Sequence, residues 1–210
     1  MPKKISAKLG EYLPDNPDRD NPGVVKAQNV IPHKTSFRPV RNIVEESDPL
    51  DGVCRGAMAL RDYGGVVHNY AGDLTKLYER SGSTYTDISR SIVGGSSADG
   101  YVVPDTHNWT FARMYNNVVA ANGSSVLQEQ LGFTGTFEDL IPDAGVPGNV
   151  DPTPSLRYIA EVRNILLGGW TTTQTNLVKW SGLENHRVWT PTVQQSGEQP
   201  LQRGGEITGI

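Results

Sequence analysis

Four histidines and one cysteine are the side chains best suited to chemistry in this chain of 210 residues. The histidines are His33, His68, His107 and His186, and their spacing does not match the short separations typical of metal ligands. We therefore predict that they lie on the surface or in turns. Cys54 has no histidine close to it in sequence, so we interpret it as a small strand residue rather than a nucleophile.

The acidic residues also lack a catalytic pattern. Glu45-Glu46 and Glu138-Asp139 are adjacent pairs, and neighbours in an extended strand point to opposite faces, so neither pair forms an acid/base couple. The sequence contains no glycine-rich phosphate loop followed by Lys-Ser/Thr and no Gly-x-Ser-x-Gly elbow. We predict that the protein is not an enzyme, and we assign no catalytic, cofactor-binding or metal-binding residue.

Composition indicates the kind of fold that could position such residues. With 23 Gly, 14 Pro and 36% hydrophobic residues, the chain favours short strands joined by tight turns. A formal net charge of −4 argues against a protein that grips nucleic acid broadly. The single cysteine excludes a disulfide within the chain and favours reducing assembly conditions. We expect no signal peptide and no membrane segment, since no apolar run approaches the ~20 residues needed to cross a bilayer.

A degenerate repeat organises most of the chain. Residues 70–89 contain an apolar run that stops at Gly72, a second apolar run, and a turn into a final strand. The same order returns at Gly123 and Gly169, which are spaced by 51 and then 46 residues. A period near fifty with several short strands per unit is typical of β-propeller blades. We therefore predict an all-β fold built from β-propeller-like repeats.

Alternation and turn signals predict three consecutive four-stranded antiparallel blades between residues 55 and 190. The predicted strands are 57–61, 66–71, 74–79 and 85–89; then 109–114, 118–123, 125–128 and 137–140; then 156–162, 165–167, 177–181 and 187–189. Residues 91–104 and 141–154 are links, and residues 204–210 look like the start of a further strand. Residues 51–210 therefore form three units and the start of another. Because propellers usually have four to eight blades, either the chain continues or neighbouring chains complete the sheet edges.

Residues 1–50 differ from this pattern. They are rich in turn formers and contain short apolar patches between prolines, which remove backbone donors and favour extended geometry. We predict an extended N-terminal arm that is ordered by a neighbouring protein, with a disordered tail as the alternative.

Aromatic residues recur at matching positions of the predicted blades, and packing between blades is the preferred interpretation. They are Tyr78, Tyr85, Trp109, Trp180 and Trp189. Trp109 is expected inside, against an adjacent sheet, whereas His107 is expected in an exposed turn. An aromatic platform for sugars is the alternative, although residues 181–189 lack the Asp and Gly of the Ser-x-Asp-x-Gly-x-Thr-Trp turn of sialidase-like propellers.

An ordered set of short motifs carries a resemblance to a known family. The set includes Asn29-Val30-Ile31-Pro32, Tyr70-Ala71-Gly72, Trp109-Thr110-Phe111-Ala112, Arg157-Tyr158-Ile159-Ala160 and Trp180-Ser181-Gly182-Leu183. In this order the chain resembles tailed-bacteriophage structural proteins with a β-propeller body, of the nozzle or packaged-DNA stabilisation type. The resemblance implies a ring of six copies in the virion tail or neck, assembled in the host cytoplasm, next to portal, adaptor and tail proteins. DNA would be present only as the contents of the channel.

Three hypotheses follow for function. The first is a structural protein of the virion that helps to enclose or retain packaged DNA. The second is a glycan-binding propeller, such as a receptor-binding or sialidase-like module, whose mark would be arginine and carboxylate groups converging in a pocket. The third is a scaffold propeller unrelated to phage, which a genome neighbourhood without portal or terminase genes would support.

Overall fold

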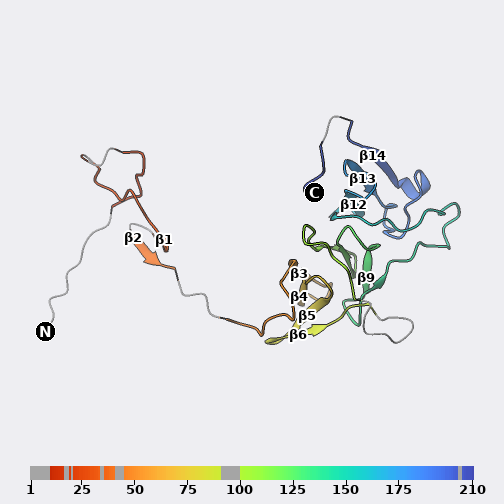
Figure 1. Ribbon diagram of the computed structural model, residues 1–210, viewed down its shortest axis with the longest axis horizontal. Helices are drawn as coiled ribbons and strands as arrows, with labels where there is room; N and C mark the ends of the chain where they lie inside the picture. The colour runs from red at the N-terminus through yellow and green to blue at the C-terminus, as the bar shows by residue number, and fades with distance from the viewer. Residues whose placement is uncertain are drawn as a thin grey trace. The chain divides into compact units, whose positions relative to one another are not determined.

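The structure is a computed structural model and describes residues 10–16, 19, 21–33, 36–40, 45–90, 100–202 and 205–210. The chain forms two compact units, Met1–Glu45 and Glu46–Ile210 (Figure 1). In the first unit, β1 (Val30–His33) pairs antiparallel with β2 (Ser36–Pro39). These two strands therefore pair with each other within the unit itself. Among the described residues, no helix has the length and apolar character needed to cross a lipid bilayer.

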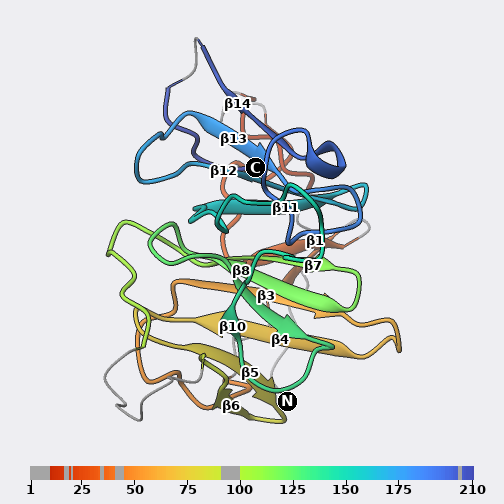
Figure 2. The same cartoon turned by 90° about the vertical axis from the view of Figure 1, so that its right-hand side faces the viewer.

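The second unit contains three consecutive four-stranded antiparallel sheets, in each of which strands adjacent in sequence are paired (Figure 2). The first sheet comprises β3 (Gly56–Arg61), β4 (Val67–Gly72), β5 (Leu77–Ser81) and β6 (Thr84–Asp87). The second comprises β7 (Thr110–Met114), β8 (Asn117–Ala121), β9 (Gln128–Leu131) and β10 (Glu138–Asp139). The third comprises β11 (Tyr158–Val162), β12 (Ile165–Gly169), β13 (Leu177–Trp180) and β14 (Gly197–Pro200). The all-β prediction and the three four-stranded antiparallel sheets are confirmed, and these sheets do not close into a ring.

Strand pairing defines which residues of the three sheets are equivalent. The pairs at the open end of the first hairpin of each sheet, farthest from its turn, are Gly56 with Gly72, Thr110 with Ala121, and Tyr158 with Gly169. Gly72, Ala121 and Gly169 are therefore equivalent, so the predicted match at Gly123 is two residues out of register. The reason is local, because Asn122 and Gly123 lie in the turn that follows the strand.

Polar side chains shape these turns and delay the third strand of the first two sheets. Asp73 Oδ1 accepts the backbone N–H groups of Thr75 and Lys76 at 2.7 and 2.6 Å. Asn122 Oδ1 accepts two backbone N–H groups in the same way, both at 2.8 Å. Because these bonds fold the backbone into a turn, β5 begins at Leu77 and β9 at Gln128, each three residues later than predicted.

The last strand of the third sheet also differs from the prediction. Residues 187–189 are not a strand, and β14 takes their expected place beside β13. Trp189 is instead fully buried in a core, while Gly197 lets β14 approach the ring of Trp180 closely. The further strand predicted at 204–210 is also absent from residues 205–210, and residues 203–204 lie outside the described residues. Ile207 N–H donates to Thr175 O at 2.9 Å, so this segment follows the turn between β12 and β13.

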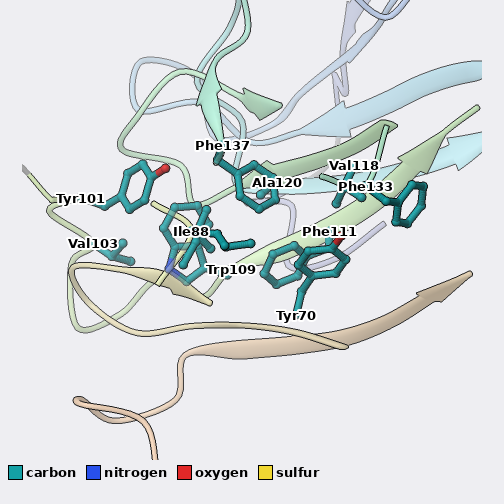
Figure 3. Packing of buried hydrophobic residues seen from close by; sticks show 11 residues of the cluster. Tyr70, Ile88, Tyr101, Val103, Trp109, Phe111, Val118, Ala120, Phe133 and Phe137 are labelled. Carbon is teal, nitrogen blue, oxygen red and sulfur yellow. The ribbon is translucent and has the colours of Figure 1, made fainter. Parts of the chain in front are cut away.

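Two apolar cores join the three sheets. The core between the first and second sheets is largely aromatic, and it includes Tyr70, Trp109, Phe111, Phe133 and Phe137 (Figure 3). The core between the second and third sheets is largely aliphatic, and it includes Met114, Val119, Leu156, Leu166 and Trp189. The second sheet therefore contributes one of its faces to each core.

Trp109 is buried in the core between the first and second sheets, as predicted. We call this contact the first joint, and the contact between the second and third sheets the second joint. Only 3% of the Trp109 surface is exposed, and its Nε1–H donates to Asp73 O at 2.7 Å. A Cβ on Gly72 would lie 2.3 Å from the indole Cδ1. Glycine at this position therefore allows the ring to lie directly on β4.

Candidate functional site

Strand β9 carries three consecutive buried polar residues, Gln128, Glu129 and Gln130. Each is at most 4% exposed, which is unusual for polar side chains unless hydrogen-bond partners are present. Successive side chains of a strand point to opposite faces. The two glutamines therefore face the first sheet, and Glu129 faces the third.

Two tyrosines reach the glutamines from the side of the first sheet. Tyr70 in β4 donates its hydroxyl to Gln130 Oε1 at 2.7 Å, and Tyr101 in the first link donates to Gln128 Oε1 at 3.1 Å. Burial raises the pKa of both tyrosine hydroxyls, so both remain protonated donors. The hydrogen bonds that link the first two sheets at β9 are therefore made between neutral groups.

The glutamine amides are satisfied on the second sheet itself. Gln128 Nε2 donates to Val126 O at 2.9 Å and to Asp139 Oδ1 at 2.7 Å. Gln130 Nε2 donates to Gly135 O at 2.8 Å. These bonds hold the amides in one orientation, with the carbonyl oxygens presented to the tyrosines.

Glu129 makes the corresponding contact with the loop between β13 and β14, and this contact is ionic. Its Oε1 accepts His186 Nε2 at 2.5 Å and Asn117 Nδ2 at 3.2 Å. Its Oε2 accepts two nitrogens of Arg187, Nε at 3.0 Å and Nη2 at 2.5 Å. Charge-assisted contacts of this kind are among the strongest hydrogen bonds in proteins.

The protonation state of Glu129 follows from two opposing effects. Burial raises the pKa of its carboxyl group, but hydrogen bonds and charge from His186 and Arg187 outweigh burial, and the pKa is lowered. Glu129 is therefore ionised at neutral pH. A buried carboxylate with this set of donors holds a loop of the third sheet in a defined position against the second.

A pocket of about 440 Å³ lies beside Arg187. It is lined by Glu129, Leu131, Thr134, Gly135, Thr136, Glu138, Asp139, Ile141 and Arg187. Arginine and carboxylate groups therefore do converge in a pocket, although no sequence motif indicates it. Most of these groups already have protein partners: Arg187 binds Glu129, and Asp139 accepts Arg90 Nη1 at 2.7 Å. Glu138 also accepts Thr136 Oγ1 at 3.2 Å.

Two of the four histidines lie at turns, as the prediction allowed, but both are buried, so the predicted exposure of His107 is wrong. His186 is buried against Glu129, and His107 is buried with Nδ1 at 2.9 Å from Asn122 O and its ring against Trp170. Burial, followed by the charge of Arg157, lowers the pKa of His107. His68 is partly buried, 2.6 Å from Glu79 Oε1. The side chain of His33 lies outside the described residues.

The remaining candidates are spread over the second unit. Cys54 is exposed and precedes β3, so its predicted strand position is wrong. Glu138 and Asp139 are neighbours in β10 and do not face the same side of the strand. Among the described residues, no group of three or more His, Cys, Asp or Glu side chains is placed to hold a metal ion.

The matching aromatic residues have packing roles. Trp109 and Trp189 are buried in the two cores, and Tyr78 is buried with its ring edge-on to Tyr85. Trp180 is partly buried, and its Nε1–H donates to Gln195 O at 2.8 Å. Packing between and within sheets, rather than a sugar platform, therefore accounts for most of these side chains.

The polar residues of β9 are not among the functional candidates predicted from the sequence. A signal was present, since three polar residues lie between Leu127 and Leu131 in the central repeat. A strand of this kind is stable in a core only if other segments supply donors and acceptors. The partners on other segments lie between 27 and 60 residues away and have no spacing rule that would reveal them.

Comparison with known proteins does not assign the chain to a family. The sequence matches no protein-family model, and no curated protein matches it. The role of Gln128, Glu129 and Gln130 is therefore inferred from their geometry. Their buried polar groups are bonded to protein partners and join the three sheets.

Proposed function

We propose that this protein is a structural component of a tailed-phage virion, part of the tail nozzle or neck ring that encloses or retains the packaged DNA. In this proposal the second unit belongs to a β-propeller and has no catalytic role. The observation that carries the proposal is the set of buried polar contacts on β9. Gln128, Glu129 and Gln130 all direct their polar groups to protein partners. Such contacts favour a rigid wall segment over a site that exchanges substrate.

The arrangement of the first strands supports the propeller part of the proposal. Strand β7 lies next to β3 on one side and β11 on the other. Arg113 Nη1 in β7 donates to Arg61 O in β3 at 2.6 Å. Propeller blades are four-stranded sheets repeated around a central channel, and adjoining first strands are compatible with that arrangement.

The location of the protein in particles tests the proposal directly. Antibodies against residues 46–210 should label purified virions of the virus that encodes this chain at one end of the capsid. Negative-stain images of the assembled protein should show rings with a central opening. Purified virions that lack the chain, or labelling over the whole capsid surface, would overturn the proposal.

The first unit provides a second test. If residues 1–45 pack on a neighbouring protein in the tail, limited proteolysis should remove them from the free chain and spare residues 46–210. The same sites should resist cleavage in the assembled ring. Equal resistance in both states would show that this unit does not need a neighbour to be ordered.

The pocket beside Arg187 favours a second candidate, a glycan-binding module. Carboxylates such as Glu138 can accept hydrogen bonds from sugar hydroxyls, and Leu131 and Ile141 supply apolar walls. A glycan array with the purified chain distinguishes the candidates. Binding at micromolar concentration that is lost in Glu138→Gln, but retained in the exposed control Glu184→Gln, would favour the glycan-binding module.

A further inference from the structure

The third sheet has one apolar face that no other sheet covers within residues 46–90, 100–202 and 205–210. Side chains that alternate with the buried core residues point to this outer face. They are Tyr158, Ala160, Val162, Ile165, Leu167 and Trp180, all of them partly buried or exposed. On the opposite face of the same strands, Ile159 and Leu166 are buried against the second sheet.

Strand register shows that the equivalent faces of the other sheets are covered. The residues equivalent to Ala160, Val162 and Leu167 are Ala112, Met114 and Val119 in the second sheet, and Met58, Leu60 and Tyr70 in the first. The second-sheet set is buried by the third sheet, and Leu60 and Tyr70 pack in the core made with the second sheet. The third sheet therefore presents the same kind of face, which only Ile207 and Ile210 cover in part, at its Gly169 end.

The first sheet presents the complementary half of this joint. Phe111 in the second sheet and Ile159 in the third lie on the face that receives the preceding sheet, and their equivalent in the first sheet is Ala57. Ala57 and Ala59 are exposed. A hollow of about 230 Å³ lies here, lined in part by these alanines, Arg80 and Tyr85. Small residues on the first sheet thus match large ones, such as Leu167 and Trp180, on the third.

We propose that the outer face of β11–β14 docks on the outer face of β3–β6 in a second copy of this chain. The described residues of the second unit make this type of sheet-to-sheet joint twice, and no sheet among them covers the two remaining outer faces, so a second copy satisfies both at once. Two copies bring six sheets, which lies within the four to eight blades that close a propeller. Such a contact is heterologous, and two of them close a dimer. The inference rests on the propeller part of the proposed function and does not depend on a location in the virion.

Analytical ultracentrifugation of the full chain tests this association. We expect a species of twice the 22.9 kDa mass of one chain at high concentration. Val162→Arg on the third sheet and Ala59→Arg on the first should each weaken the dimer at least about tenfold, because each places an unpaired charge in an apolar contact. The control is Val150→Arg in the second link, where the valine is 81% exposed and lies on neither face. It should associate like the parent chain.

A mixture of the two variants identifies the geometry. Neither variant alone can form an intact joint, but a mixed dimer contains one joint made from two unmodified faces. Mixing Val162→Arg with Ala59→Arg should therefore restore part of the association. A chain that stays monomeric, a dimer disrupted only by Val162→Arg, or a mixture that shows no recovery would each overturn the proposal.

Tryptophan fluorescence of the unmodified chain tests the same contact without the folding defects that a variant could introduce. Trp109, Trp170 and Trp189 are buried within the chain, whereas Trp180 lies on the proposed contact face. Dilution should expose Trp180 and shift the tryptophan emission to longer wavelength as the dimer dissociates. Emission that is unchanged by dilution through the dissociation range would contradict the proposed face. Neither experiment depends on virion labelling, so failure of the dimer leaves the proposed location to be decided separately.

Discussion

The joint between the first and second sheets and the joint between the second and third use different chemistry on one shared strand. The first joint combines aromatic packing with neutral tyrosine–glutamine hydrogen bonds to Gln128 and Gln130. The second combines aliphatic packing with the ionic contact of Glu129 to His186 and Arg187. A single strand can therefore hold two neighbours by contacts that respond differently to pH. The first should tolerate acid, and the second should weaken in acid.

Loss of the central aromatic side chain should have the largest effect on the first joint. Trp109→Ala should lower the free energy of unfolding by about 3–5 kcal/mol, because it removes a buried ring and leaves a cavity over Gly72. The measurement is urea denaturation of the full chain at neutral pH. Val102→Ala, at a position that is 82% exposed, should change stability by less than about 0.5 kcal/mol. A Trp109→Ala variant that unfolds like the parent would show that the first joint does not depend on this ring.

Removal of the charge at the second joint should come next. Glu129→Gln keeps the shape of the side chain but leaves Arg187 and His186 without a carboxylate partner. Breaking a buried ion pair typically costs 3–5 kcal/mol, and we expect about 2–3 kcal/mol here because Arg187 is partly exposed to solvent. Denaturant unfolding measures the loss, and Glu161→Gln, at an exposed position of β11, is the control. If Glu129→Gln costs no more than Glu161→Gln, packing alone holds the second joint.

The pH dependence should separate the two joints. The folded-state pKa of Glu129 is lowered below its ordinary value of 4.5. Its stabilising contribution is therefore fully present above pH 4.5, and it is lost as the pH falls through the lowered folded-state pKa.

The stability difference between the parent and Glu129→Gln should shrink as the pH falls below 4.5. Subtracting the variant removes the contributions of other carboxylates, such as Asp62 and Asp143, whose pKa values are also lowered. A difference that is independent of pH down to strongly acidic conditions would rule out ionisation of Glu129 as the source of this stability.

Loss of the neutral hydrogen bond between Tyr70 and Gln130 should have the smallest effect on stability. Tyr70→Phe keeps the aromatic packing and removes only the hydroxyl that donates to Gln130, so we expect a loss of about 1 kcal/mol. Unlike the loss in Glu129→Gln, this loss should not change between pH 3 and 7, because no group that titrates there is removed. Thermal unfolding across that range measures it, with Tyr63→Phe at an exposed turn as the control.

Much of the fold was predictable because it depends on local signals. Alternating strands and the tight turns at residues 62–65, 115–116 and 163–164 define hairpins between neighbours in sequence, and antiparallel meanders need only such neighbours. The errors arose where a local signal competed with a distant contact. Residues 187–189 have strand-like composition, yet Arg187 is held by Glu129 and Trp189 is buried in a core. Residues Gly197–Pro200 have a lower strand propensity, yet they form the strand because glycine at 197 fits under the ring of Trp180.

The candidate site could not be predicted to the same extent. Glutamine and glutamate in β9 would normally indicate an exposed strand, and His107 next to a proline- and aspartate-containing turn would normally be exposed. Their burial is possible only because the partners come from other parts of the chain: Tyr70 and Tyr101, His186 and Arg187, and Asn122. Sequence periodicity contains no information on which distant donors will meet a given acceptor.

The sequence by itself determined that the described part of the second unit contains three antiparallel four-stranded sheets, because strand alternation and turn residues act over a few positions. It also determined that Trp109 would be buried, since a large apolar ring beside a strand gains free energy by leaving water. Only the tertiary structure decided which polar residues would join the sheets and which sheet faces would stay open. Those outcomes depend on how whole sheets stack, because a buried polar group needs a partner from the adjoining sheet and an apolar face needs a neighbour to cover it.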